Sequence, residues 1–369
     1  METPQSREIG GEFSLPTEYL HRNSTNQFSK YCQYGRQVLL TSGRAALKLV
    51  VRSLKLGRRD EVLLPSYLCK DILKPFREEG VRITFYKVED TLNVDVDDVE
   101  SRISKNTKAL LFIHYFGFPQ PATERIASLS SQSGIFLIED LVQSFLTNLR
   151  GKPLGSAGDV TVSSYRKWMP IPDGALLGIN NAGFSVLSAR NSSREAQLYV
   201  KKRIAALKLK GKYFSKSGLP KRVFEEAFAA ADEFLGTTPV RISDYSRRML
   251  RRFDFEAIIA KRRENFERFL RATSRLKIVR PIYKDLPADV CPLGFPILTR
   301  DRNVVKRMLI KNQIYPPIHW RLPTELDRQD FPVPWRVSNN ILTLPIDQRY
   351  DVRDMDFLAD TLREIEATL

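Results

Sequence analysis

The stretch Gly155-Ser-Ala-Gly-Asp-Val-Thr-Val-Ser-Ser-Tyr-Arg-Lys167 decides how this chain is interpreted, because a strand-like apolar run in it ends at a Ser-x-x-Lys sequence. A second apolar run upstream, Ile135-Phe-Leu-Ile-Glu-Asp140, ends at a carboxylate. Ligands of open parallel sheets bind beyond the carboxyl ends of the strands, so Ser164, Lys167 and Asp140 are expected to lie near one another. A lysine held among such neighbours can form a Schiff base with a carbonyl compound. A single lysine is usually a solvated surface amine, so the interpretation depends on the whole set.

Short apolar runs rich in β-branched and aromatic residues recur along the first half of the chain. Most are continuously apolar, which is typical of strands buried on both faces of a parallel sheet. Segments with one apolar helical face lie between them, for example at 45–56 and 121–133. This alternation predicts an α/β protein with an open, mostly parallel sheet. The expected strands are 61–65, 82–88, 109–114, 135–139, 160–164 and 175–179.

We expect three parts along the chain: an N-terminal arm (1–35), a large domain (36–250) and a smaller α+β C-terminal domain (251–369). The large domain includes polar, basic helices without strand signals between about 184 and 231. The smaller domain is predicted to contain helices at 253–270, 303–311 and 354–367 and a strand at 293–298.

Composition places the chain among ordinary folded proteins. Of its 369 residues, 42% are hydrophobic and 28% are charged, which argues against wholesale disorder. No apolar run approaches a membrane span, and the first residues lack the pattern of a secretory signal. Cys32, Cys69 and Cys291 are too few and too scattered for a disulfide framework or a metal site, so a cytoplasmic location is expected.

The charge balance of 59 Lys+Arg against 43 Asp+Glu gives +16, and much of the excess lies in 201–216 and 247–263. A solvated helix face is the first interpretation, at roughly even odds, because charge runs discriminate poorly. Nucleic acid and an anionic small molecule, such as a nucleotide diphosphate, are the alternatives. No nucleic-acid-binding motif is present, so nucleic acid is not expected as a partner.

A helix-start sequence, Thr41-Ser-Gly-Arg-Ala-Ala-Leu47, adds a third feature. The free backbone N–H groups of Gly43 and Arg44 suit a phosphate, although the same pattern is also an ordinary N-cap. Together with Asp140 and Lys167 it meets the three needs of pyridoxal phosphate (PLP). These needs are a phosphate site, an acidic partner for the ring nitrogen and an amine for the aldehyde.

With these motifs the chain resembles the DegT/DnrJ/EryC1/StrS family, PLP-dependent aminotransferases of the aspartate-aminotransferase fold (fold type I), as a divergent member. Six segments in order carry the resemblance, and each looks like a family motif. They are Ser42-Gly-Arg-Ala-Ala-Leu47, Leu64-Pro-Ser-Tyr67, Ile113-His-Tyr-Phe-Gly117, Ile138-Glu-Asp-Leu-Val-Gln143, Gly155 to Lys167 and Ser338-Asn-Asn-Ile-Leu-Thr-Leu-Pro345.

The resemblance implies roles for single residues. Lys167 would be the Schiff-base lysine and proton carrier, and Asp140 would pair with the protonated pyridine nitrogen. Gln143 would reach the phenolic oxygen of the cofactor, and His319 would face the substrate. Ser164, Gly43 and Arg44 would bind the phosphate. For His114 we favour a structural role at a strand end by about two to one over direct chemistry.

Three departures from the family pattern bear on the substrate. Cys69 stands where the family commonly has an aromatic residue over the cofactor ring, so either Tyr67 or another ring stacks there or that face of the cofactor is covered differently. The usual Gly-Glu-Gly-Gly is reduced to Pro172-Asp-Gly174-Ala. Arg241-Ile-Ser-Asp-Tyr-Ser246 is at best a remote counterpart of the Asn-Tyr-Arg-Met segment that serves the neighbouring subunit.

The resemblance implies a cytoplasmic, homodimeric PLP-dependent aminotransferase. The expected amino donor is glutamate, and the expected acceptor is a nucleotide-linked keto-sugar of polysaccharide or natural-product biosynthesis. The family's sugar dehydratases replace the lysine by histidine, so Lys167 argues against that reaction. The alternative is a non-catalytic or regulatory PLP-binding protein of the same fold, possibly associated with nucleic acid.

Overall fold

A computed structural model describes residues 8–15, 23–25, 27–215 and 218–369 of the chain. Its centre is a seven-stranded sheet with the strand order β2-β10-β9-β6-β5-β3-β4. Strand β10 runs antiparallel to its two neighbours, β2 and β9, and the other six strands all run in the same direction. The predicted α/β class with a mostly parallel sheet is therefore confirmed. The strands are β2 (Arg36–Leu40), β3 (Glu61–Pro65), β4 (Arg82–Tyr86), β5 (Thr107–Ile113), β6 (Phe136–Asp140), β9 (Val160–Ser164) and β10 (Ala175–Ile179).

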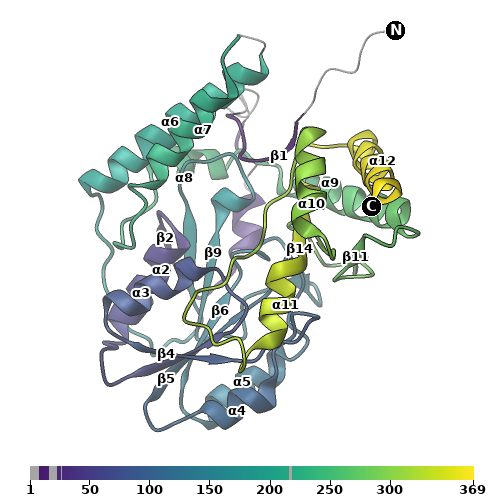
Figure 1. The fold of residues 1–369 in the computed structure, drawn as a ribbon. Helices are drawn as coiled ribbons and strands as arrows, with labels where there is room; N and C mark the ends of the chain where they lie inside the picture. Colours follow the sequence, from purple (N-terminus) through teal and green to yellow (C-terminus); the bar gives the residue numbers. More distant parts are fainter. Residues whose placement is uncertain (1–7, 16–22, 26, 216–217) are drawn as a thin grey trace.

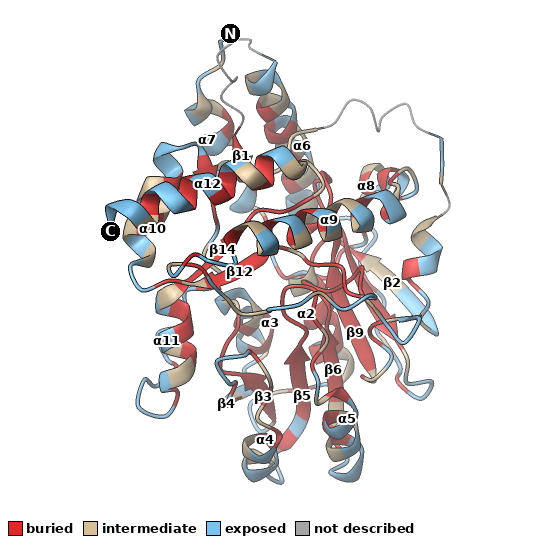
Figure 2. Ribbon diagram, turned by 90° about the vertical axis from the view of Figure 1, so that its right-hand side faces the viewer, coloured by how far each residue is buried: buried red, intermediate tan, exposed pale blue. Residues whose placement is uncertain are grey.

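The six strands expected from the sequence are all present, and their bounds shift by two residues at most. Their apolar runs form the buried interior of the sheet, as Figure 2 shows for β3, β5, β6 and β9. Strand β2 was not expected. It lies at the sheet edge, and its first residues, Arg36 and Gln37, are exposed, so its sequence lacks the continuous apolar run of a central strand.

Helices with exposed outer faces pack around this sheet (Figure 2). Each alternates with a strand along the chain, as the sequence pattern predicts. These helices are α2 (Gly43–Ser53), α3 (Leu73–Glu78), α4 (Val96–Arg102) and α5 (Thr123–Gln132), with short 3₁₀ turns at Gln27–Tyr31, Lys70–Ile72 and Tyr165–Lys167 and a small hairpin of β7 (Asn148–Leu149) and β8 (Lys152–Pro153).

A pair of helices, α6 (Arg194–Phe214) and α7 (Lys221–Asp232), follows the sheet and projects from the body of the molecule (Figure 1). The basic stretch 201–216 lies mainly on α6, but it is not a uniform solvated face. Lys201 and Lys208 are exposed, whereas Arg203 and Lys210 are buried. Part of the basic excess is therefore built into the packing of this helix.

Among the described residues, the chain from 244 onward contains a three-stranded antiparallel sheet and five helices. The expected helices at 253–270, 303–311 and 354–367 and the expected strand at 293–298 are all present within a few residues. The elements are α8 (Asp244–Leu250), α9 (Phe255–Thr273), β11 (Arg280–Pro281), β12 (Phe295–Leu298), α10 (Arg302–Lys311), β13 (Ile314–Tyr315), α11 (Pro332–Asn340), β14 (Ile341–Leu344) and α12 (Val352–Thr368).

The described part of the N-terminal arm is packed against the rest of the chain. Strand β1 (Ile9–Gly10) pairs in parallel with β13, and Ile9 is buried. Residues 1–7, 16–22 and 26 of the predicted arm lie outside the described residues. The three-part division at 35 and 250 stays a prediction.

Two large apolar clusters hold the body of the protein together. One surrounds the central sheet, and the second joins residues from both sides of position 250. The second cluster includes Tyr165 and Trp168 beside the lysine turn, and Phe253 and Phe255 from the start of α9. The segment that carries Lys167 is therefore packed directly against the C-terminal region. Among the described helices, none is long and apolar enough to cross a membrane.

Candidate active site

A cavity lies at the carboxyl ends of the central strands, between the start of α2 and the turn that follows β9. Its lining includes all six residues predicted to bind the cofactor or form its Schiff base. These are Gly43, Arg44, Asp140, Gln143, Ser164 and Lys167. They come from three separate segments, 43–44, 140–143 and 164–167, so the fold brings together residues that lie up to 124 positions apart in the sequence.

Lys167 ends the 3₁₀ turn Tyr165–Lys167, directly after β9. Burial lowers the pKa of its amine, whereas Cys69 and the Asp140 carboxylate act in the opposite direction. Trp168 anchors this turn: its indole N–H donates to the Val142 carbonyl at 3.2 Å, and its own carbonyl accepts from Gln348 at 2.7 Å. A lysine with a lowered pKa is more often neutral, which a nucleophilic amine requires.

Asp140 is the last residue of β6 and is only 2% exposed. Its Oδ1 accepts the Val142 backbone N–H at 2.8 Å, which leaves the second oxygen for the cavity. Burial raises the pKa of this carboxyl to about 6, although the Val142 N–H and the Lys167 charge lower it. A buried carboxylate of this kind is stabilised by a cationic partner, and a protonated ring nitrogen would be one.

Gln143 provides the clearest test of fit to the cofactor. Its Oε1 accepts the Phe116 backbone N–H at 3.0 Å, which fixes the amide. Its Nε2 is buried, lies in the cavity lining and has no partner among the described residues. A buried donor without an acceptor is costly, so an oxygen of a bound molecule is expected there. The phenolic oxygen of PLP fits this requirement.

The N-terminus of α2 has the features that a phosphate site requires. Ser42 is the N-cap, and its Oγ accepts the Ala45 backbone N–H at 3.2 Å. The first backbone N–H groups of a helix lack intrahelical partners and favour anions, so those of Gly43 and Arg44 suit a phosphate. Ser164 lines the cavity as well, and the Arg44 guanidinium lies 3.4 Å from Asp71 at its rim.

The ring that covers the cavity comes from the C-terminal region. Tyr67 does not line the cavity, because its hydroxyl donates to the His319 carbonyl and its ring packs against Tyr115 and Trp320. Trp320 does line it, with its ring centroid 5.9 Å from the Lys167 Nζ. Cys69 also lines the cavity. Trp320 is therefore the aromatic residue available where Cys69 replaces the usual ring.

The two histidines singled out from the sequence have different surroundings. His114 is fully buried: its Nε2 lies 2.9 Å from Glu139 Oε1, and its Nδ1 accepts the Gln120 backbone N–H at 2.8 Å. This satisfied arrangement agrees with the structural role that we favour. His319 lines a neighbouring cleft together with Lys167 and contacts Thr343 at 2.9 Å. Burial and the Lys167 charge lower the pKa of His319 to about 3, so its ring is neutral near pH 7.

Several residues that line the cavity were not singled out from the sequence, and Arg166, Leu235 and Trp320 are among them. Arg166 precedes Lys167 directly, and Trp320 follows His319, so their places beside predicted site residues were the available signals. Leu235 follows α7, and no signal in the sequence links that helix to the site. Arg166 donates through Nη1 to the Tyr199 hydroxyl at 2.8 Å and to Asp232 at 3.3 Å.

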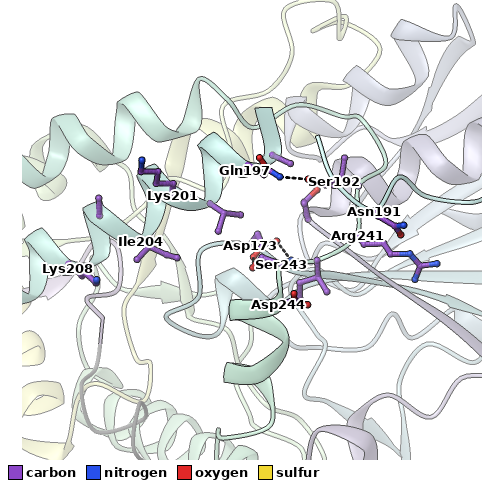
Figure 3. A pocket seen from close by; sticks show the side chains of 16 residues that line it. Asp173, Asn191, Ser192, Gln197, Lys201, Ile204, Lys208, Arg241, Ser243 and Asp244 are labelled. Carbon is purple, nitrogen blue, oxygen red and sulfur yellow. Dashed lines mark hydrogen bonds between the residues drawn. The ribbon is translucent and has the colours of Figure 1, made fainter. Parts of the chain in front are cut away.

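A separate pocket of about 660 Å³ lies between α6 and the start of α8, and Figure 3 shows its side chains. It contains two departures from the family pattern, Asp173 and the segment 241–246. Asp173 is buried and accepts hydrogen bonds from the Ser243 backbone N–H and hydroxyl, at 2.8 Å and 2.6 Å, and from the Ser246 hydroxyl. Asp173 therefore anchors the start of α8 rather than lining the lysine cavity.

Comparisons with known proteins agree with this geometry. Residues 21–177 match the model of the DegT/DnrJ/EryC1/StrS aminotransferase family. The GDP-perosamine synthase of Vibrio cholerae is 28% identical over 156 residues, which are 42% of either chain. A dTDP-4-dehydro-2,3,6-trideoxy-D-glucose 4-aminotransferase of Saccharopolyspora spinosa is 38% identical over 129 residues, 35% of this chain and 33% of the relative. The chain thus spans about a third to two fifths of these relatives.

The likeness in structure extends over almost the whole chain. The Streptococcus pneumoniae protein Spr1654, solved in a PLP form, superposes with a TM-score of 0.72 at 15% identity and covers 98% of this chain and 99% of its own. At this identity the likeness shows the fold alone. The resemblance to the DegT/DnrJ/EryC1/StrS aminotransferase family is therefore borne out over residues 21–177, and the expected fold type I architecture over the structure as a whole.

Proposed function

We propose that the protein is a PLP-dependent aminotransferase. The observation that carries this proposal is the single cavity that joins Lys167, the half-paired carboxylate of Asp140, the unpartnered amide of Gln143 and the N-terminus of α2. Each of these groups matches one part of the cofactor, and the relatives are named as aminotransferases and a perosamine synthase. Bound there, PLP would supply an electron sink for proton removal at the carbon that bears the amino group.

Each residue of the cavity would have a separate role in the reaction. Lys167 would hold the cofactor and then move the proton, which its lowered pKa favours. Asp140 would keep the ring nitrogen protonated, and Gln143 would orient the phenolic oxygen. Gly43, Arg44 and Ser164 would hold the phosphate, Trp320 would cover the ring and exclude water, and His319 would face the substrate from the neighbouring cleft.

The substrates and assembly are part of the proposal. Glutamate is the proposed amino donor, and a nucleotide-linked keto-sugar is the proposed acceptor, because the relatives act on GDP- and dTDP-linked sugars by name. We further propose a cytoplasmic homodimer. Addition of candidate keto-sugars to the glutamate-treated protein tests the acceptor, since the true acceptor restores the absorbance that glutamate removes.

Visible absorbance spectroscopy tests the activity. The protein purified with PLP is expected to show a visible band that disappears when glutamate is added. Lys167→Ala is expected to lack the band, whereas Lys70→Ala, which removes an exposed lysine near the cavity, is expected to keep it. A band that persists in Lys167→Ala would show that another lysine holds the cofactor.

Two other outcomes would decide against the proposal. A protein that stays colourless after reconstitution with PLP does not bind the cofactor. A band that responds to no amino donor would instead favour the non-catalytic, regulatory alternative, and salt-sensitive DNA binding by the same protein would support it.

A further inference from the structure

A second cleft, of about 410 Å³, adjoins the lysine cavity and shares Arg166 and Lys167 with it. Parts of the chain that are distant in sequence form its walls: the N-terminal segment 10–13, helices α6 and α9, and the C-terminal residues 343–349. The family match ends at residue 177, so most of this cleft lies outside the matched segment.

The lining of the cleft carries an excess of positive charge. Besides Lys167 it contains four arginines, but only two carboxylates, Glu12 and Asp347. One of the arginines, Arg349, is paired with Asp347 at 2.7 Å. The other three are Arg166, Arg203 and Arg262. Asp232 lies outside the lining and pairs with Arg166 and Arg203, but the positive charges at the cleft still outnumber the carboxylates.

Arg262 is a buried cation whose hydrogen bonds do not involve a carboxylate. It is 1% exposed, and its hydrogen bonds go to neutral acceptors, the Gln348 side chain at 2.8 Å and the carbonyls of Leu293 and Pro292 at 2.8 Å and 3.3 Å. No carboxylate of the described residues forms an ion pair with it, although the Asp347 carboxylate raises its pKa from farther away. A buried charge is costly unless it is paired, so an anion at this cleft would lower the cost.

Arg203 and Arg166 also have hydrogen-bonding capacity that the protein does not use. Arg203 is 3% exposed; its Nη2 pairs with Glu12 at 2.6 Å and its Nη1 with Asp232 at 3.4 Å, while its Nε is buried without a partner among the described residues. Arg166 bonds the Tyr199 hydroxyl and Asp232 through the same nitrogen, Nη1. Guanidinium groups with free nitrogens bind carboxylates and phosphates well.

We propose that this cleft is an oxyanion subsite, in which Arg166, Arg203 and Arg262 bind an acidic group of a substrate beside Lys167. The proposal rests on the proposed function for the identity of that substrate. Two sources share this chemistry. One is the side-chain carboxylate of the amino donor, and the other is the diphosphate of a nucleotide-linked acceptor.

Calorimetric titration with two unreactive probes separates the sources. Glutarate represents the dicarboxylic donor, and uridine diphosphate represents the acceptor. We expect the wild-type protein to bind at least one probe, and Arg203→Met and Arg166→Met to bind that probe at least tenfold more weakly. Lys201→Met is the matched control, because it removes an exposed cation from α6 outside this cleft, and it is expected to bind like wild type.

One further variant and the exposure of Arg166 keep the test informative if a variant misfolds. If Arg203→Met fails to fold, Arg203→Lys keeps a cation in the same place, and Arg166, whose side chain is 25% exposed, tolerates truncation more easily. Loss of glutarate binding alone assigns the subsite to the donor, and loss of uridine diphosphate binding alone assigns it to the acceptor. Wild-type affinity in both arginine variants, an equal loss in Lys201→Met, or no binding by wild type overturns the inference.

The titration involves no turnover, so its failure can be distinguished from failure of the proposed function. If the visible band responds to glutamate but probe binding is the same in the arginine variants as in wild type, the aminotransferase proposal stands and the subsite proposal fails. If the arginine variants bind the probe more weakly but the protein never forms the visible band, the subsite proposal stands and the aminotransferase proposal fails.

Discussion

Asp140 shows how burial tunes one residue for its proposed partner. Burial raises the pKa of this carboxyl to about 6, above the ordinary 3.8. Between about pH 4 and pH 6 the folded protein therefore holds a proton that the unfolded chain releases. Stability falls as pH rises through this window, and the full penalty, on the order of 3 kcal/mol, applies above it. A positive ring nitrogen would offset this penalty, which links the carboxylate to the cofactor.

Asp140→Asn is accordingly expected to stabilise the cofactor-free protein at pH 8 by up to about 3 kcal/mol and to leave it nearly unchanged at pH 4. Urea unfolding at the two pH values measures this. Asp347→Asn is the control of opposite sign. Burial raises the pKa of Asp347, but the Arg349 guanidinium at 2.7 Å, the Arg262 charge and the Arg349 backbone N–H together lower it below its ordinary value. This change is therefore expected to destabilise the protein at pH 8. A less stable Asp140→Asn protein at pH 8 would contradict the prediction.

At the scale of residues, the sequence was sufficient where function depends on strand ends. Asp140 and Ser164 end apolar strands, and parallel strands end at one edge of a sheet, so their meeting follows from the pattern. Trp320 and Arg203 could not be placed this way. They reach the site from the C-terminal region and from a projecting helix, through packing that no local pattern encodes.

At the scale of elements, the start of α2 is the part whose geometry the proposed phosphate site needs most. Ser42 caps this helix through the Ala45 N–H, and the cap holds the first turn in place. Helix α6 begins in the same way, with Ser193 accepting the Ala196 N–H at 3.1 Å. The two caps therefore form a matched pair, one at the proposed site and one away from it.

Ser42→Ala and Ser193→Ala are each expected to destabilise the protein by about 1 kcal/mol, because each removes an N-cap. Only Ser42→Ala is expected to weaken binding of inorganic phosphate, several-fold, since fraying of the first turn displaces the N–H groups of Gly43 and Arg44. Thermal unfolding and competition of phosphate with PLP measure the two effects. Equal phosphate affinity in both variants would show that the start of α2 does not bind the phosphate.

Elements were predictable from the sequence where burial gives them a continuous pattern. All the strands of the sheet interior were expected, whereas the edge strand β2 was missed because half of it faces solvent. Helix α11 and strand β14, which meet at 340 and 341, were also not expected as elements, although Ser338 to Pro345 was noted as a motif. A sequence motif identifies a segment but does not indicate whether that segment is a helix or a strand.

At the scale of the whole molecule, the predicted boundary at residue 250 runs through a shared apolar cluster. Trp168 beside Lys167 packs with the residues that begin α9, and the Arg262 guanidinium lies 4.8 Å from the Trp168 ring centroid. The lysine cavity also takes Trp320 from beyond the boundary. The C-terminal region therefore forms part of the site and of its support.

A fragment of residues 1–250 is expected to be unable to form the site by itself. It would break the buried apolar cluster that Tyr165, Trp168 and Met249 share with Phe253 and Phe255, and it would lack the ring of Trp320. We expect this fragment to bind a hydrophobic dye strongly, to unfold without a cooperative transition and to form no visible band with PLP. Co-expression with residues 251–369 is expected to restore the band, because the two pieces rebuild the cluster. A fragment that binds PLP and unfolds cooperatively would instead show that residues 36–250 are an independent cofactor domain, with the C-terminal region acting on the substrate alone.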